Sequence, residues 1–182
     1  MTVSPRPPYR PTGWRLAVAL LTAVGVMGLG AQLDVPMHPV PMSLQSLAVL
    51  AAGALLGPVW GTVAVLTYLA AGALGLPVFA GGEAGIDRFL GPTAGYLVAF
   101  PFSAALVGEA TRRSWMARPA SALLVGIAGH AVLLGLGTAW LARSMGTPEA
   151  VAAGLTPFIV GAIVKSGVLA VLTVALSGRA AP

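Results

Sequence analysis

Cysteine and charged residues are the scarce components of this sequence. None of the 182 residues is a cysteine, which excludes a disulfide framework, a thiol nucleophile and a thiolate metal site. Only 8% of the residues are charged, against roughly 25% in ordinary soluble domains. A soluble protein cannot cover its surface with so few charges, and 57% of these residues are hydrophobic. The composition predicts an integral membrane protein and argues against soluble, disordered and nucleic-acid-binding classes.

Long uncharged stretches, interrupted by proline and glycine, predict an all-α fold with six transmembrane helices. The uncharged stretch 35–82 is too long for one span of about 20 residues, and Gly57-Pro58 divides its helical part into an antiparallel hairpin. The expected spans are 16–33, 43–56, 59–74, 93–110, 121–141 and 155–176. We expect a disordered cytoplasmic arm over 1–15, a single transmembrane domain over 16–178 and a short cytoplasmic tail over 179–182. A cleaved signal peptide is the alternative for the first apolar run, which is longer than a signal core of about 7–15 residues.

The distribution of arginine predicts the orientation in the membrane. With six spans and the N-terminus inside, only Arg88 and Arg143 lie outside. The inside segments hold Arg6, Arg10, Arg15, Arg112, Arg113, Arg118 and Arg179. Lys and Arg accumulate on the cytoplasmic side of membrane proteins, so both termini are expected in the cytoplasm.

Residues suited to catalysis are few. His38 lies in a proline-rich outer loop, and His130 lies in the middle of a span, where an interhelical hydrogen bond is the simpler interpretation. Neither histidine has an evident metal or nucleophile partner in the sequence, so no enzyme, metal or cofactor is predicted.

Lys165 is the strongest single indication of function. An ionisable residue inside a membrane span is costly and usually faces a cavity or a partner. If its span starts near Leu155, Lys165 lies ten residues, or roughly 15 Å, below the outer face. A buried ammonium suits an anionic solute, above all a carboxylate. The structural alternative is an ion pair with Glu83 or Asp87.

The glycine-rich segment 75–92 is the second indication. Its glycines allow backbone groups to approach a ligand closely, and an irregular segment that enters the bilayer must line a cavity. An ordinary external loop is the alternative. The apolar centre of the segment, residues 76–80, favours the first interpretation.

Three sequence runs resemble the BioY family, the biotin-binding S components of energy-coupling-factor (ECF) transporters. These runs are residues 36–50 (PMHPVPMSLQSLAVL), 75–82 (GLPVFAGG) and 91–96 (GPTAGY). The resemblance covers about residues 16–176. It implies a six-helix membrane protein that captures biotin from outside and delivers it inward.

The last span departs from the family pattern at one position. Where the family has P-F-x-x-G-D-x-x-K, this chain has PFIVGAIVK over 157–165, so Lys165 is kept and Ala162 replaces the aspartate. Either Glu83 or Asp87 supplies the missing carboxylate, or the affinity or the ligand differs.

The resemblance and the residues together predict a binding site for biotin. Lys165 would hold the valerate carboxylate, and Glu83, Gln45 or backbone groups of the glycine segment would bind the ureido ring. The full set of predicted site residues is Lys165, Gly81, Gly82, Glu83, Phe79, Gln45, Tyr96, Asp87 and Arg88.

Partners are implied by the family as well. The chain has no G-x-x-x-x-G-K-[ST] motif, so any ATP energy must come from partner subunits. The resemblance implies that these are two cytoplasmic ATPases with a transmembrane T subunit, docking near Ala19 and Ala23, and that the chain lies in the plasma membrane of a prokaryotic cell. Operation without these partners is the alternative. Two alternatives are a carrier for another anionic vitamin-like solute and a small membrane enzyme that uses His38 or His130.

Overall fold

Helices make up most of the computed structural model, which describes residues 12–179. The long helices are α1 (Trp14–Gln32), α2 (Gln45–Ala73), α3 (Ala94–Arg112), α4 (Pro119–Met145) and α6 (Phe158–Arg179), and the short helix α5 (Thr147–Gly154) joins α4 to α6. The shorter elements are the antiparallel strands β1 (Asp34–Val35) and β2 (Met42–Ser43) and the 3-10 turns η1 (Ala80–Gly82), η2 (Ile86–Phe89) and η3 (Trp115–Ala117). All five long helices are apolar and long enough to cross a membrane.

A break at Gly57 turns α2 into two membrane segments. Gly57 has φ 80° and ψ −179°, which no α-helix contains, and Pro58 follows it without a backbone donor. The two arms fold back on each other so closely that a Cβ on Gly61 would lie 2.7 Å from the Cα of Gly53. With α2 counted as two segments, the predicted six spans and the predicted hairpin are confirmed.

Glycine also brings α2 into backbone contact with α3. A Cβ on Gly108 would lie 2.5 Å from the backbone of Gly57 and Pro58, and one on Gly53 would collide with the carbonyl of Ala104. Small residues of this kind allow helices in a membrane to pack closely, where apolar burial gives little driving force.

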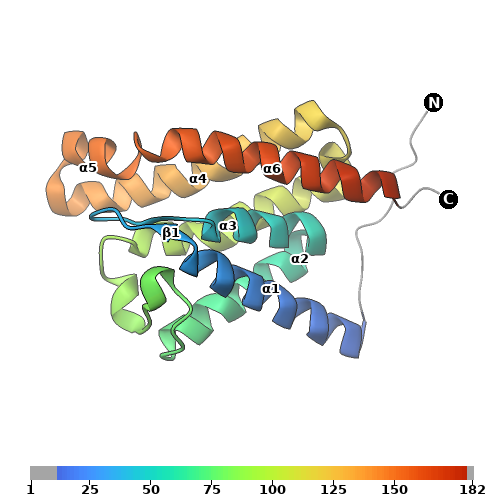
Figure 1. The fold of residues 1–182 in the computed structure, drawn as a ribbon, viewed down its shortest axis with the longest axis horizontal. Coiled ribbons are helices and arrows are strands. Elements are labelled where there is room, and N and C mark those ends of the chain that lie inside the picture. Colours follow the sequence, from blue (N-terminus) through green and yellow to red (C-terminus); the bar gives the residue numbers. More distant parts are fainter. Residues whose placement is uncertain (1–11, 180–182) are drawn as a thin grey trace.

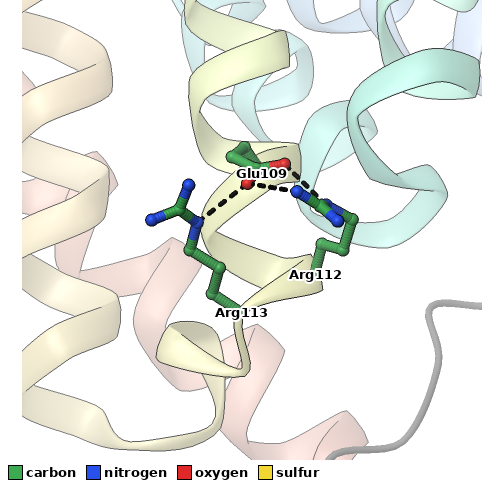
Figure 2. A network of polar contacts seen from close by, with 3 residues as sticks. All are labelled: Glu109, Arg112 and Arg113. Atoms are coloured by element: carbon green, nitrogen blue, oxygen red, sulfur yellow. Dashed lines mark hydrogen bonds and ion pairs between the residues drawn. The ribbon is translucent and has the colours of Figure 1, made fainter.

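The two ends of the bundle differ in charge. Figure 1 shows the start of α1, the end of α6 and the α3–α4 connection at one end, and α5, the strands and the 75–92 segment at the other. Of the arginines predicted to lie inside, those within the described residues are at the first end: Arg15, Arg112, Arg113, Arg118 and Arg179. Figure 2 shows Glu109 between two of them, accepting hydrogen bonds of 2.7 Å from Arg112 and 2.8 Å from Arg113.

Several predicted boundaries need correction. Trp14 and Arg15, assigned to the N-terminal arm, form the first turn of α1, and Arg179, assigned to the tail, is the last residue of α6. The rest of the predicted arm through residue 11 and the tail residues 180–182 lie outside the described residues. The polar stretch after Arg143 is helical, because α4 runs on to Met145 and α5 begins at Thr147.

The docking of partner subunits near Ala19 and Ala23 stays a prediction. Ala23 packs against the core of the bundle, and Ala19 is half-buried. Ala23 is therefore not part of the exposed face of α1, which is formed by Val18, Leu21, Val26 and Leu29.

The orientation of the bundle can be tested with single cysteines, because the native chain has none. We expect Ala117→Cys, exposed in η3, to resist an impermeant external thiol reagent in intact cells and to react after the cells are opened. Glu149→Cys, exposed on α5 at the opposite end, is the matched control and should react from outside. Labelling of Ala117→Cys in intact cells contradicts the predicted orientation.

Candidate functional site

A cavity lies among the helices near the end that holds the strands and the 75–92 segment. The space not occupied by protein atoms is about 770 Å³, which includes volume that is open to solvent. The apolar residues that line it are Val40, Pro41, Phe79, Ala80, Leu97, Phe100, Leu133, Leu134, Phe158 and Ala162. The polar ones are Ser43, Gln45, Ser46, Glu83, Arg88, Thr93, Tyr96, His130 and Lys165. An apolar wall with a few polar groups is typical of a small-molecule site.

Lys165 brings a positive charge to this cavity from α6. Its Nζ donates hydrogen bonds to the carbonyl of Ser43 at 2.6 Å and to Oγ of Ser46 at 3.0 Å. An ammonium has three donors, so one remains for a ligand. Among the described residues no carboxylate forms an ion pair with Lys165, which argues against the structural alternative. Because α6 begins at Phe158, Lys165 lies about 10 Å along the helix, less than the depth expected from the sequence.

Glu83 and Arg88 form an ion pair at the cavity. The Arg88 guanidinium donates to the Glu83 carboxylate at 2.6 Å, and both side chains are partly exposed. Nε of Arg88 is buried and has no hydrogen-bond partner among the described atoms. The charge of Glu83 is thus already balanced, and Glu83 does not serve Lys165 as a counterion.

A chain of hydrogen bonds holds the glycine segment against α2. Nε2 of Gln45 donates to the hydroxyl of Tyr68 at 2.6 Å, and that hydroxyl donates to the carbonyl of Val78 at 2.7 Å. The ring of Phe79 packs edge-on against Tyr68 with centroids 5.7 Å apart. A Cβ on Gly72 would collide with the Phe79 ring, so the glycine provides the space that this ring occupies.

Comparison with known proteins agrees with this arrangement. The model of the BioY family matches residues 9–181, nearly the whole chain. The chain belongs to the BioY family. A probable biotin transporter BioY from Pyrococcus horikoshii is 39% identical over 86% of this chain and 92% of its own length. The biotin transporter BioY of Thermotoga maritima is 33% identical over 88% of this chain and 94% of its own length.

A solved structure shares the fold of this BioY-family chain. It is the crystal structure of the S-component for biotin from an ECF-type ABC transporter, with a TM-score of 0.78 and 28% identity. The match covers 93% of this chain and 95% of that one. Together with the apolar helices, these relatives identify the chain as a multi-pass protein of the prokaryotic plasma membrane.

The structure brings six of the nine predicted site residues to the cavity. These are Lys165, Glu83, Phe79, Gln45, Tyr96 and Arg88. The prediction identified them from charge, from the glycine segment and from the resemblance to BioY proteins. Sequence reasoning missed other residues of the wall, among them Ser43, Ser46 and Phe100, because nothing in their residue types distinguishes them from helix packing.

Gly81, Gly82 and Asp87 are exposed and do not line the cavity, which corrects their assignment to the site. Gly81 and Gly82 have φ of 69° and 72° and form the tight turn η1, whose ends are joined by a hydrogen bond between Phe79 and Glu83. Their effect on the cavity is therefore indirect, through these two neighbours. Asp87 is the second residue of η2, and its carbonyl accepts the N–H groups of Leu90 and Gly91, which follow the turn.

Tyr96 has a structural contact in addition to its place in the cavity wall. Its hydroxyl donates to the carbonyl of Gly154 at 2.7 Å, which ties α3 to the end of α5. The tilted ring packs 6.4 Å from that of Phe158. Gly137 faces the Tyr96 ring so closely that a Cβ there would collide with it.

His130 lines the cavity although it was not among the predicted site residues. The predicted interhelical hydrogen bond is confirmed, because Nδ1 of His130 on α4 lies 3.0 Å from Oγ of Ser166 on α6. His38 is exposed and does not line the cavity. Across residues 12–179, no three His, Asp or Glu side chains come together as a potential metal site.

The chain from Gln45 to Val78 predicts a measurable role for Tyr68. Tyr68→Phe removes the hydroxyl and leaves a buried donor on Gln45 and an acceptor on Val78 without their partner. We expect the free energy of unfolding to fall by about 1–3 kcal/mol, seen as a lower thermal midpoint in detergent. Thr67→Val is the control, because its hydroxyl bonds only to Val63 of the preceding turn and is exposed. Equal midpoints for the two variants contradict a role for this chain in stability.

Proposed function

We propose that the chain is the biotin-binding S component of an ECF-type uptake transporter, capturing biotin from outside the cell. The observation that carries the proposal is the cavity of a BioY-family chain in which no carboxylate of residues 12–179 pairs with Lys165. The curated relatives are named as biotin transporters, and the structural neighbour as the S-component for biotin. No chemistry takes place on the ligand.

The valerate carboxylate of biotin is assigned to Lys165. Of the two cations that line the cavity, Arg88 already faces Glu83 at 2.6 Å, whereas Lys165 contacts only neutral oxygens of Ser43 and Ser46. An anion is therefore stabilised most where the positive charge is not yet balanced. A charge-assisted hydrogen bond between ammonium and carboxylate is about twice as strong as a neutral one.

The ring system of biotin is assigned to the apolar and aromatic wall. Phe79 precedes η1, Tyr96 and Phe100 lie on α3, and Phe158 begins α6, so three parts of the chain place aromatic rings around the same space. Gln45 reaches that space from the start of α2, although its Nε2 donates to Tyr68. Glu83 stays a candidate for the ureido group only if the ligand displaces Arg88.

Uptake requires partners. The sequence holds no P-loop, and the structural neighbour comes from an ECF-type ABC transporter. We therefore infer that two cytoplasmic ATPases and a transmembrane T subunit act with this chain. High affinity for biotin belongs to the same proposal.

Ligand selectivity tests the proposal first. We expect the purified protein to bind biotin in preference to thiamine and riboflavin, which lack its valerate tail and ureido ring, and mass spectrometry to find biotin in protein purified without added ligand. Lipoate, which keeps the valerate tail but has no ureido ring, distinguishes biotin from another anionic solute. The assignment is contradicted if the folded protein binds lipoate with the same affinity as biotin, or if it binds neither ligand.

Lys165 is tested by comparing biotin with its neutral amide. Hydrogen bonds to charged groups contribute roughly 1.5–3 kcal/mol, so Lys165→Ala should weaken binding of biotin by about 10- to 100-fold. The neutral amide should bind the native protein and the variant nearly equally. Isothermal titration with both ligands measures the difference.

Two further variants control this comparison. Lys165→Met keeps an apolar stem of similar length and removes only the charge, so it should behave as Lys165→Ala does and remain folded. Arg88→Gln removes the cation that Glu83 already balances, and it should affect acid and amide alike. A Lys165 variant that also affects both ligands alike shows that Lys165 is structural.

A further inference from the structure

One nitrogen of His130 is buried at the cavity without a hydrogen-bond partner. The side chain is 3% exposed and belongs to the cavity wall. Nδ1 lies 3.0 Å from the carbonyl of Gly126 and 3.0 Å from Oγ of Ser166, whereas Nε2 has no partner among the described residues. Leaving a buried polar atom without a hydrogen bond costs about 1–3 kcal/mol of stability. We therefore expect Nε2 to have a hydrogen-bond partner in the functional state of the protein.

The partners of Nδ1 define what Nε2 can do. The carbonyl of Gly126 can only accept, so the proton of the neutral imidazole belongs on Nδ1. Ser166 fits this tautomer. Its hydroxyl hydrogen is donated to the carbonyl of Ala162 at 2.7 Å, so its oxygen is free to accept a hydrogen bond from Nδ1. Nε2 is then an acceptor, and the partner that it lacks is a donor.

The other groups of the wall near His130 do not supply that donor. Ala162 contributes a methyl group, and Leu133 and Leu134 are apolar. Lys165 donates to Ser43 and Ser46, and its remaining N–H makes no hydrogen bond to His130. A molecule that fills the cavity is the remaining source of the donor.

We propose that Nε2 of His130 accepts a hydrogen bond from a ring N–H of the bound ligand, which under the proposed function is a ureido N–H of biotin. This inference rests on the proposed function and adds a specificity-determining residue to it. His130 selects a ligand that carries an N–H donor on its ring, because a ligand without one leaves Nε2 buried and unpaired. Lys165, in contrast, selects for the charge of the tail.

Two substitutions separate the two nitrogens of His130. An asparagine amide reaches the position of Nδ1 and can keep the bond to Gly126, but it places nothing at Nε2. A glutamine amide extends to the position of Nε2 and can present its oxygen there as an acceptor. We expect His130→Asn to weaken biotin binding by about 10-fold or more, and His130→Gln to stay within a few-fold of the native protein.

The order of the variants decides between a ligand contact and a structural role. The inference is overturned if His130→Asn binds biotin with the affinity of the native protein, or with a higher affinity than His130→Gln. Thermal midpoints measured without ligand should show the opposite order, because only asparagine keeps the contacts of Nδ1. Failure of the native protein to bind biotin at all overturns the proposed function, which distinguishes the two failures.

A measurement on the native chain covers the case in which the variants do not fold. The sequence holds two histidines, so the ¹⁵N signals of the imidazoles are few, and His38→Gln identifies those of His130. Saturation with biotin should move the signal of the unprotonated Nε2 upfield, as accepting a hydrogen bond does. A signal that stays in place shows that a water, or nothing, faces Nε2 and overturns the inference.

Discussion

Gly53 and Gly61 allow the two arms of α2 to touch at the backbone, and the cavity depends on that contact. In a straight helix Gln45 and Tyr68 would be about 34 Å apart, at 1.5 Å for each of the residues between them. The reversal at Gly57 brings them to a hydrogen bond of 2.6 Å. Tyr68 then holds the carbonyl of Val78, so the bend of α2 positions the segment that forms part of the cavity wall.

Two of the buried polar groups that lack a partner in the described residues lie at this cavity. Across the described residues, four buried side-chain atoms have none, on Arg88, Ser103, His130 and Thr138. Arg88 and His130 both line the cavity. Turning either side chain toward the lipid would not supply the missing hydrogen bond, because lipid tails offer no partner to a polar group. Lys165, with one donor left, adds a third incomplete group. A polar ligand in the cavity can therefore form hydrogen bonds with several of these groups at once. The apolar side chains of the bundle have no polar atoms with which to do so.

Much of the fold follows from proline and glycine in the sequence, because these residues end helices for local reasons. Gly57-Pro58 predicted the hairpin correctly, whereas α5, at eight residues too short to span a membrane, was not among the predicted helices. Lys165 was predicted because a charge inside an apolar span needs a reason. The free nitrogen of His130 could not be predicted, since it depends on which neighbour Nδ1 faces after the helices have packed.

The cavity groups also come from helices that are far apart in the chain. Gln45 and Ser46 belong to α2, His130 to α4 and Lys165 to α6, and the Glu83–Arg88 pair lies in the connection between α2 and α3. A ligand that bonds to His130 and Lys165 and packs on Phe79 connects these elements with one another. The ligand then stabilises the arrangement in which these helices meet at the cavity. The size of this stabilisation is the difference between the ligand's affinity for that arrangement and its affinity for other arrangements. Binding therefore favours the arrangement of helices described here, and no chemical step is needed for this.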